Sequence, residues 1–473
     1  MKLNPLIVEP ALEFANGSHV CPRAGIAEHH VYDAQFSARR DKILIGGVGT
    51  SESLEKLAAW FERVAGYIPA KPGAKQPTLF PPFIGFNKGG GFRSELTFDG
   101  EIARYLKPSE ISETLKIGDH NEMVSAAVNL YYRQVKFLAQ NRNVDVIVCV
   151  LPDDFFEAVS NEPPRPDDED TKDGGGQEET NFRRLLKARC MHLGRPLQIT
   201  REVTLGAGDA GQQDDATRAW NFCTALYYKA NQTVPWKLQP NVNRPSVCFA
   251  GIGFYRSRDR KVLHTSLAQV FDELGNSVIL RGTPVDVNKD DRRPYLSEEQ
   301  AHDLLAQALY EYEVAMEHSP ARLVIHKSSN YREGEVIGMR AAAEKMRVGS
   351  VDFVTVLNAD FRLFRDGSYP PYRGTHVEFD RDHHLLYTRG AVPYYKTYPG
   401  NYVPRPLDVR LVECDESSTV ICKEILSLTK MNWNNTQFDG KYPINLRCAR
   451  KVGEIMKYLK PDDQPQIGYS FYM

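Results

Sequence analysis

The chain has 473 residues, of which 42% are hydrophobic and 25% are charged, and its formal net charge is −2. A chain of this length can bury sizeable cores in about two to four domains, and its composition is that of an ordinary globular protein. These values exclude a disordered chain and a uniformly basic one. A nucleic-acid-binding surface would therefore have to come from local clustering of cations.

The cysteines and the apolar runs indicate the cellular compartment of the protein. Eight cysteines occur without any C-x-x-C pair, and several lie in apolar runs, so we expect buried free thiols in a reducing compartment and no zinc site. The N-terminus has no signal-peptide pattern, and no run approaches the roughly 18 apolar residues of a membrane span. We expect a cytoplasmic protein with no membrane contact.

Strands and helices alternate from about residue 20 to residue 225, as in a Rossmann-like α/β unit. Residues 41–68 predict a strand, a glycine turn and a capped helix, and residues 122–141 predict an amphipathic helix. The run VDVIVCVLP (144–152) is typical of a buried parallel strand, and residues 181–193 have helical spacing.

Two glycine-containing segments of this region have more than one interpretation. GGVGTS (46–51) fits a tight turn capped by threonine or serine, or a phosphate-binding turn, but it matches neither G-x-G-x-x-G nor a Walker motif. Residues 161–180, rich in proline, acids and glycine, predict a solvated acidic loop. A strand precedes this loop and a helix follows it, so we place it inside the first domain.

The second half of the chain has the element order of a ribonuclease-H-like fold: antiparallel strands, a helix, then strands that cross back. A hairpin is predicted at 247–271, and SEEQ, which begins at Ser297, predicts the capping box of a helix that ends near His318. Three further strands and two further helices are predicted at 277–281, 321–329 and 351–360, and at 333–346 and 445–459.

Cations and an amide recur at spacings that could hold a terminal phosphate. Arg183 and Lys187 lie four residues apart, on one helical face, and Gln198 follows eleven residues later. Lys229 and Lys237 lie among tyrosines and a tryptophan in LYYKANQTVPWKL. Clustered cations with a neutral amide donor suit a phosphate, and an aromatic ring could stack on a base. Taken alone, a basic pair on a helix is more often a solvated face than a phosphate site, and only the combination favours a phosphate.

The order R-x-x-x-K, Gln, YYKANQTVPWKL and CFAGIGFYR resembles the MID and PIWI domains of Argonaute proteins, over roughly residues 120–473. With nothing that matches N-terminal and PAZ domains, the chain resembles a short prokaryotic Argonaute. The resemblance implies a MID domain at 1–225, with the acidic loop, and a PIWI domain at 226–473. It also implies a pocket for a guide 5′ phosphate, made by Arg183, Lys187, Gln198, Lys229 and Lys237.

The resemblance places two catalytic carboxylate positions of active PIWI domains on Gly253 and Ser328. Neither residue supplies a carboxylate ligand for the divalent ions that activate water, and the segment 432–435, where a further ligand is expected, has none. We therefore expect no catalysis by this chain. The alternative is an active metal-dependent guided nuclease whose ligands come from other nearby carboxylates: Asp259, Asp272, Asp352 and Asp360.

Further cations are candidates for contact with the guide or target backbone. Arg389, Lys396 and Arg405 are interleaved with tyrosines in residues 387–407, a pattern that suits a nucleic-acid groove or tyrosines packed on the core. The last helix places Arg447 and Lys451 one turn apart, near the guide 5′ end in the family. The resemblance also implies that the carboxylate of Met473 could hold Mg²⁺ against the guide phosphate. His376, His383 and His384 were considered as metal ligands, but adjacent residues of a strand point to opposite faces.

The resemblance implies a recognition subunit that binds a small guide RNA and a complementary single-stranded DNA target from an invader. It is closest to the Argonaute of SPARSA defence systems, in which an APAZ-domain partner carries a sirtuin-like effector, with a TIR effector as the alternative. The implied output is antiviral defence by NAD depletion and abortive infection, with NAD bound by the partner of the heterodimer and not by this chain. A guide-independent scaffold for protein partners is the third hypothesis.

Overall fold

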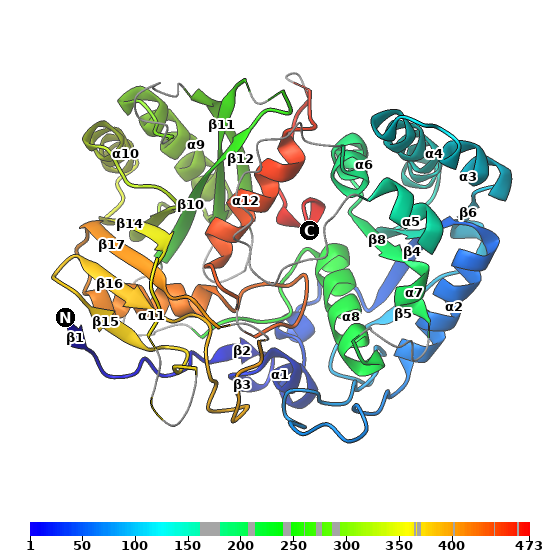
Figure 1. Cartoon of the computed structure of the whole chain (residues 1–473), viewed down its shortest axis with the longest axis horizontal. Coiled ribbons are helices and arrows are strands. Elements are labelled where there is room, and N and C mark those ends of the chain that lie inside the picture. Colours follow the sequence, from blue (N-terminus) through cyan, green and yellow to red (C-terminus); the bar gives the residue numbers. More distant parts are fainter. Residues whose placement is uncertain are drawn as a thin grey trace.

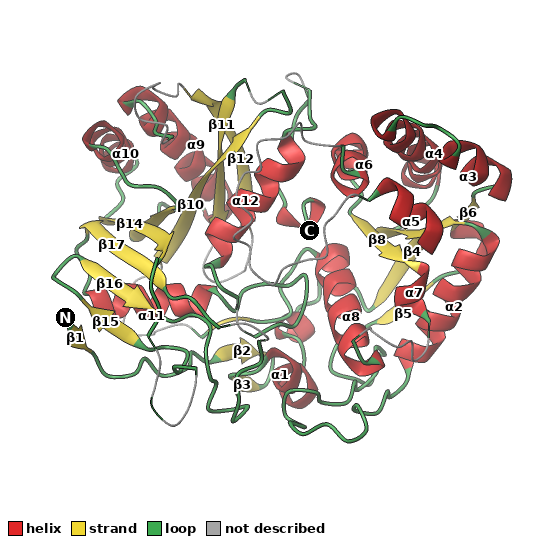
Figure 2. Cartoon of the chain, viewed as in Figure 1, coloured by secondary structure: helices red, strands yellow, loops and turns green. Residues whose placement is uncertain are grey.

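The computed structural model describes residues 1–160, 180–206, 213–239, 247–259, 261–270, 277–285, 294–363, 366, 370–400, 403–438, 440–460 and 463–473. For residues 266–270, 277–278 and 283 it describes the backbone alone. The predicted acidic loop (161–180) lies outside the described residues except for its last position. Two halves, each built on a sheet with helices, lie side by side (Figures 1 and 2).

A mostly parallel sheet organises the first half, in the order β5-β4-β7-β8, with β6 also paired to β4. Its strands are β4 (Lys42–Gly49), β5 (Glu95–Thr97), β6 (Ala103–Tyr105), β7 (Val146–Leu151) and β8 (Leu197–Arg201). Its longer helices are α2 (Ser51–Ala65), α4 (His120–Asn141), α6 (Phe182–Cys190) and α8 (Asp215–Asn231). Shorter helices are α1 (Pro22–His29), α3 (Pro108–Leu115), α5 (Asp153–Val159) and α7 (Glu202–Leu205).

Helices cover both faces of this sheet, and the central strand β7 is therefore apolar at every position. Val146 and Val148 face the core that contains α2 and α8, while Ile147 and Cys149 face the core that contains α4 and α6. Fully buried parallel strands read as continuous apolar runs for this reason. The predicted Rossmann-like unit is confirmed.

The segment GGVGTS is a tight strand-to-helix turn. Gly46 to Gly49 lie within β4, and the Oγ1 of Thr50 accepts a hydrogen bond from the backbone N–H of Ser53 at 3.1 Å, which caps α2. A Cβ at Gly47 would lie 2.5 Å from the ring of Phe98. The glycine there allows close packing beneath the strand.

A nine-stranded sheet organises the second half. Its strands are, in spatial order, β1 (Lys2–Leu3), β15 (His376–Glu378), β16 (His383–Leu386), β17 (Leu407–Glu413), β14 (Ser350–Asn358), β13 (Arg322–Lys327), β10 (Val247–Arg256), β11 (Leu263–Val270) and β12 (Ser277–Val285). β10, β11 and β12 are antiparallel, and β13 and β14 run parallel to β10. This is the predicted ribonuclease-H-like order.

Two layers of helices enclose the central strand β10. Cys248, Ala250 and Ile252 pack in one core with α9 (Glu298–Met316) and α10 (Glu333–Lys345). Phe249 faces the opposite core with α11 (Ser418–Leu428) and α12 (Ile444–Met456). α12 lies so close to β10 that a Cβ at Gly251 would be 2.5 Å from the carbonyl carbon of Asn445.

The predicted capping box at Ser297 is confirmed, because its Oγ accepts from the N–H of Gln300 at 3.1 Å and the Gln300 side chain accepts from the N–H of Ser297 at 3.0 Å. The hairpin at 247–271, the helices at 333–346 and 445–459, and the strands at 321–329 and 351–360 are present within a few residues of the predicted ends. The eight cysteines are free, and seven are buried.

The sequence placed the boundary between the two domains at residues 225 and 226. That boundary falls inside α8, which continues to Asn231. The first residues also leave the first half: β1 pairs with β15 of the nine-stranded sheet. A third, small sheet joins β2 (Leu12–Phe14) to β3 (Gly17–His19) and β9 (Lys237–Leu238), so the N-terminal segment connects both halves.

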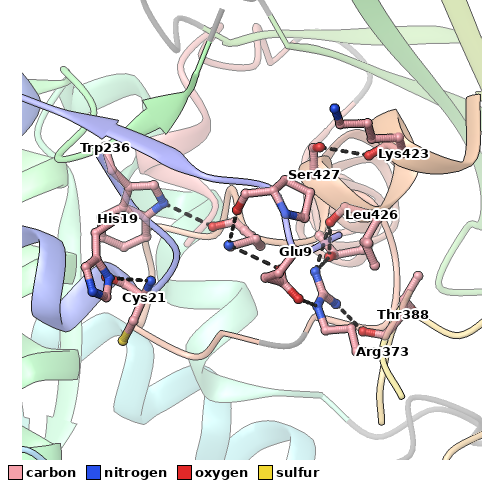
Figure 3. Close-up of polar contacts among 12 residues, drawn as sticks. Glu9, His19, Cys21, Trp236, Arg373, Thr388, Lys423, Leu426 and Ser427 are labelled. Atoms are coloured by element: carbon pink, nitrogen blue, oxygen red, sulfur yellow. Dashed lines mark hydrogen bonds and ion pairs between the residues drawn. The ribbon is translucent and has the colours of Figure 1, made fainter. Parts of the chain in front are cut away.

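A buried ionic network holds this N-terminal segment in place (Figure 3). The Oε2 of Glu9 accepts from the Nε of Arg373 at 2.9 Å, and its Oε1 lies 3.2 Å from the Nζ of Lys430. Arg373 also donates to the carbonyl oxygen of Leu426 at 2.9 Å, and Trp236 donates to that of Lys430 at 3.0 Å. Burial opposes ionisation of Glu9, but the two cations outweigh it and lower the pKa of this carboxyl.

Replacing Glu9 with glutamine should lower the free energy of unfolding by about 3–5 kcal/mol, because it removes the carboxylate that two buried cations contact. Urea denaturation followed by circular dichroism at pH 7 measures the change. The matched control is Glu52→Gln, since Glu52 forms an exposed pair with Lys56 at 2.8 Å, and solvent screening should make its effect on stability small. Equal effects of the two substitutions would contradict this account of the network.

Candidate nucleic-acid interface

Lys229 is a buried cation at the centre of the candidate pocket. It lies in the last turn of α8, where the helix dipole favours a positive charge, and only 2% of the residue is exposed. Its Nζ donates to the side-chain oxygen of Gln198 on β8. Burial, followed by the positive charges of Arg183 and Lys451, lowers the pKa of Lys229 to about 7.

Helix α6 supplies two more cations. Asn181 caps the helix by accepting from the N–H of Arg184 at 3.0 Å. Arg183, in the first turn, donates to the carbonyl oxygen of Ile199 at 3.0 Å, which holds it against β8. Lys187, one turn later, donates to the main-chain oxygen of Met473. The predicted helical face therefore points toward β8 and the C-terminal residue, not toward solvent alone.

Helix α12 brings Lys451 to the same place from the other half of the chain. α12 contacts α6, and α8 contacts the short C-terminal turn at Tyr469–Phe471. Figure 1 shows the C-terminal residue lying among α6, α8 and α12. The resemblance placed Arg447 and Lys451 among the backbone contacts and near the guide 5′ end, and the structure places Lys451 close enough to Lys229 to lower its pKa.

Lys237 lies apart from this group. It belongs to β9, where its Nζ lies 3.7 Å from a carboxylate oxygen of Glu13 on β2 and 4.5 Å above the ring of Tyr32. The pairing of β9 with β2 sets this direction. The structure thus brings together Arg183, Lys187, Gln198 and Lys229 of the predicted set, with Lys451 added, and gives Lys237 a different partner.

Phe156 is an aromatic neighbour of the pocket that the sequence analysis did not identify. Its ring centroid lies 5.8 Å from the guanidinium carbon of Arg183 and 4.5 Å from that of Arg201. The sequence contains a signal for this residue, because Phe156 lies in the short helix α5, directly after the buried strand β7. Helices that follow parallel strands carry residues to the carboxyl edge of the sheet, where ligands bind.

The gathered side chains suit an anion. Four cationic side chains from two helices of the first half and one of the second lie near an amide. Burial, and after it the two neighbouring cations, makes the charge of Lys229 costly. A phosphate group would relieve this repulsion and accept hydrogen bonds from several donors at once.

The tyrosine-rich segment combines both predicted readings. Tyr387 and Tyr395 are buried, the latter with its hydroxyl 3.2 Å from the sulfur of Cys21. Lys396 and Arg405 are exposed, and Arg389 is half-buried. Tyr387 and Tyr395 therefore pack on the core, while Lys396 and Arg405 lie at the surface.

Gly253 and Ser328 follow the last paired residues of two neighbouring strands. β10 and β13 are parallel, and their pairing ends at Ile252 and Lys327. Gly253 is the next residue of β10, which continues to Arg256, and Ser328 directly follows the end of β13. These are the two positions that the resemblance implied for catalytic carboxylates, and neither a glycine nor a serine supplies a carboxylate.

The alternative metal ligands are dispersed. Asp352 is buried, bound by Arg322 at 2.6 Å and by the N–H of Asp415 at 2.7 Å. Asp259 accepts from Ser257 in an exposed turn, and Asp360 is exposed beyond β14. Asp272 lies outside the described residues.

Within the part of the chain that the structure describes, no three His, Cys, Asp or Glu side chains are grouped to hold a metal ion. His383 and His384 point to opposite sides, as expected: His383 lies 2.7 Å from Asp408, and His384 lies 3.2 Å from His376. His376 and His384 are buried, in contrast to the solvated strand that the sequence suggested. Among the described helices, none is long and apolar enough to cross a membrane.

The fold is that of Argonaute and Piwi proteins. The Clostridium butyricum Argonaute bound to a guide DNA and a 19-mer target DNA superimposes with a TM-score of 0.68 at 16% identity, over 99% of this chain and 54% of that one. The Marinitoga piezophila Argonaute in complex with a 5′ OH guide RNA gives 0.58 at 13% identity, over 99% and 59%. Drosophila Piwi gives 0.60 at 14% identity, over 98% and 56%.

This chain spans somewhat more than half the length of these structures. No family model matches the chain, and no curated protein is similar to it in sequence. The likeness defines an Argonaute-like fold, a MID-like α/β unit followed by a PIWI-like ribonuclease-H unit.

Replacing Lys229 with methionine should stabilise the protein at pH 7 by about 1–4 kcal/mol, because it removes a buried cation held among other cations. The folded pKa lies near 7 and the ordinary value is 10.5, so the unfolded chain binds more protons between these values and wild-type stability should rise with pH there. The gain from Lys229→Met should therefore shrink from pH 7 to pH 9. Urea denaturation at both pH values measures it.

The exposed Lys423 provides the control, and Lys423→Met should show no such pH dependence. A Lys229→Met protein that is less stable than wild type at both pH values would contradict the electrostatic account of the pocket.

Proposed function

We propose that this protein is a short Argonaute that binds a small guide through its 5′ phosphate. The observation that carries the proposal is the buried Lys229, bonded to Gln198 and surrounded by Arg183 and Lys451. A protein gains little by burying like charges together unless an anion joins them. Lys187 completes the set from the same helix as Arg183.

The guide proposed from the sequence resemblance is a small RNA, and the target is a complementary single-stranded DNA. Base pairing would read the target, while the protein contacts backbone and duplex shape. Two similar structures hold nucleic acid, a DNA guide in one and an RNA guide in the other. Arg389, Lys396, Arg405 and Arg447 are the proposed backbone contacts.

We further propose that this chain does not cleave the target. The support is the pair of residues Gly253 and Ser328, which stand at the two positions that the resemblance implied for catalytic carboxylates. Catalysis would then belong to a partner: an APAZ-domain protein with a sirtuin-like or TIR effector that depletes NAD in antiviral defence. The partner and its effector rest on the sequence resemblance alone.

The pocket fits Mg²⁺ poorly. The oxygens described there are the amide oxygen of Gln198 and the main-chain oxygen of Met473, and each already accepts a hydrogen bond from a lysine. The Met473 carboxylate is the type of ligand that a hard divalent cation prefers, but Lys187 already bonds to it and the four cationic side chains repel a metal ion. Phosphate binding is therefore assigned to the side chains themselves.

A guide with a 5′ phosphate should bind at least about tenfold more tightly than the same guide with a 5′ hydroxyl, which corresponds to about 1.4 kcal/mol. Lys187→Ala and Gln198→Ala should each reduce this ratio, because each removes a donor to the phosphate. Fluorescence anisotropy at fixed salt measures the affinities, with Lys423→Ala as the control. The proposal would be contradicted if the two guides bound with equal affinity and if neither substitution changed these affinities.

The guide-loaded protein should leave a complementary target intact in Mg²⁺ or Mn²⁺, and Gly253→Asp alone should not create cleavage, because one carboxylate cannot hold two divalent ions. Gel analysis of an end-labelled target measures this. Target cleavage that is lost on mutation of Asp259, Asp272, Asp352 or Asp360 would instead establish the nuclease alternative.

A further inference from the structure

A cavity of about 490 Å³ opens where β13 ends beside β10. Phe254 follows Gly253 within β10, and Ser328 directly follows the last residue of β13. The lining residues that matter here are Phe254, Ser328, Ser329, Asn330, Leu357 and Arg410. The cavity therefore occupies the position of a ribonuclease-H-type active site, with a different set of side chains.

The floor beside this cavity is electrically neutral. Lys327 and Glu335 are fully buried, and the Nζ of Lys327 lies 2.6 Å from both carboxylate oxygens. The N–H groups of Leu296 and Arg332 also donate to Glu335, each at 2.9 Å. The Glu335 carboxylate is therefore occupied by an ion pair and by backbone hydrogen bonds, and it cannot serve as a ligand for a cation in the cavity.

Arg410 is the charged side chain among the residues that line the cavity. Its Nη2 donates to Asp408 at 2.8 Å, and its Nη1 reaches Asn330 only at 3.5 Å. The Nε of Arg410 also lies 3.3 Å from a carboxylate oxygen of Asp408, and this carboxylate lies 2.7 Å from His383. The Arg410 side chain is 42% exposed and lines the cavity.

The polar groups of the cavity are those that bind phosphate oxygens. A guanidinium, two serine hydroxyls and an amide can all donate hydrogen bonds, and arginine binds phosphate with charge-assisted bonds. Divalent cations need the opposite set, clustered carboxylates. The side chains of this cavity therefore suit an anionic group, whereas those of a two-metal nuclease suit divalent cations.

We propose that this cavity is a phosphodiester-binding site, in which Arg410 holds one backbone phosphate of the target strand without a divalent cation. The inference rests on the proposed function, because it assumes a guide–target duplex over the PIWI-like sheet. Ser328 and Ser329 add neutral donors. The cavity would then contact the duplex at the position where a nuclease would cleave the target strand.

The test measures target affinity of the guide-loaded protein for wild type, Arg410→Ala and Arg410→Lys. Arg410→Ala should weaken target binding about 5- to 10-fold and reduce the slope of log affinity against log salt by about 1, and Arg410→Lys should recover part of the loss. Chelation of divalent ions should change nothing. Arg340→Ala is the matched control, because Arg340 also pairs with a carboxylate of β17, Glu413, and is 43% exposed.

A set of targets, each with one neutral methylphosphonate linkage, locates the contact. One linkage should weaken binding to wild type and have no further effect in Arg410→Ala, because the two changes remove the same contact. Full additivity at every linkage, or a loss no larger than that of Arg340→Ala, would overturn the inference.

Guide affinity, measured first on the same proteins, separates the two proposals. Unchanged guide affinity with weaker target binding supports the phosphate site. If wild type shows no preference for a 5′ phosphate, the guide proposal fails. The preformed guide–target duplex then takes the place of the loaded complex in the methylphosphonate series, and the same two outcomes decide on Arg410.

Discussion

The packing of the two halves imposes one electrostatic constraint, because it brings a further cation close to the buried Lys229. Lys229 on α8 and Arg183 on α6 belong to the first half, whereas Lys451 on α12 belongs to the second, so Lys451 can reach Lys229 only when the halves are packed together. The network of Glu9, Arg373 and Lys430 supports this packing from the opposite side by holding the N-terminal segment. The fold therefore maintains an unfavourable charge cluster that an anion would stabilise.

The two candidate sites share a physical logic. At the junction of the halves, cations and an amide suit the terminal phosphate of a strand, and at the end of β13 a guanidinium with hydroxyls suits a phosphate within a strand. Both sites read charge and position, not sequence. A protein built in this way would hold a guide end and a duplex and leave sequence recognition to base pairing.

Local sequence signals predicted most of the fold, because caps and apolar runs act over a few residues. The Thr50 turn and the Ser297 capping box are examples. Long-range strand pairing could not be predicted from these local signals. β1 pairs with β15, some 370 residues away, so the first residues of the chain belong to the sheet of the second half. Lys237 was misplaced for the same reason, since the pairing of β9 with β2 decides its direction. Lys451 needed the packing of α12 on α6.

The most direct test of the account is the number of protons taken up when a 5′-phosphorylated guide binds at pH 8, measured by calorimetry in buffers of different ionisation enthalpy. Lys229, with a pKa of about 7, is mostly neutral at that pH and should gain a proton when the phosphate arrives, so uptake should approach about one proton per guide. Lys229→Met should show none. Binding without proton uptake, or with the same uptake in Lys229→Met, would contradict the claim that this buried lysine holds the guide phosphate.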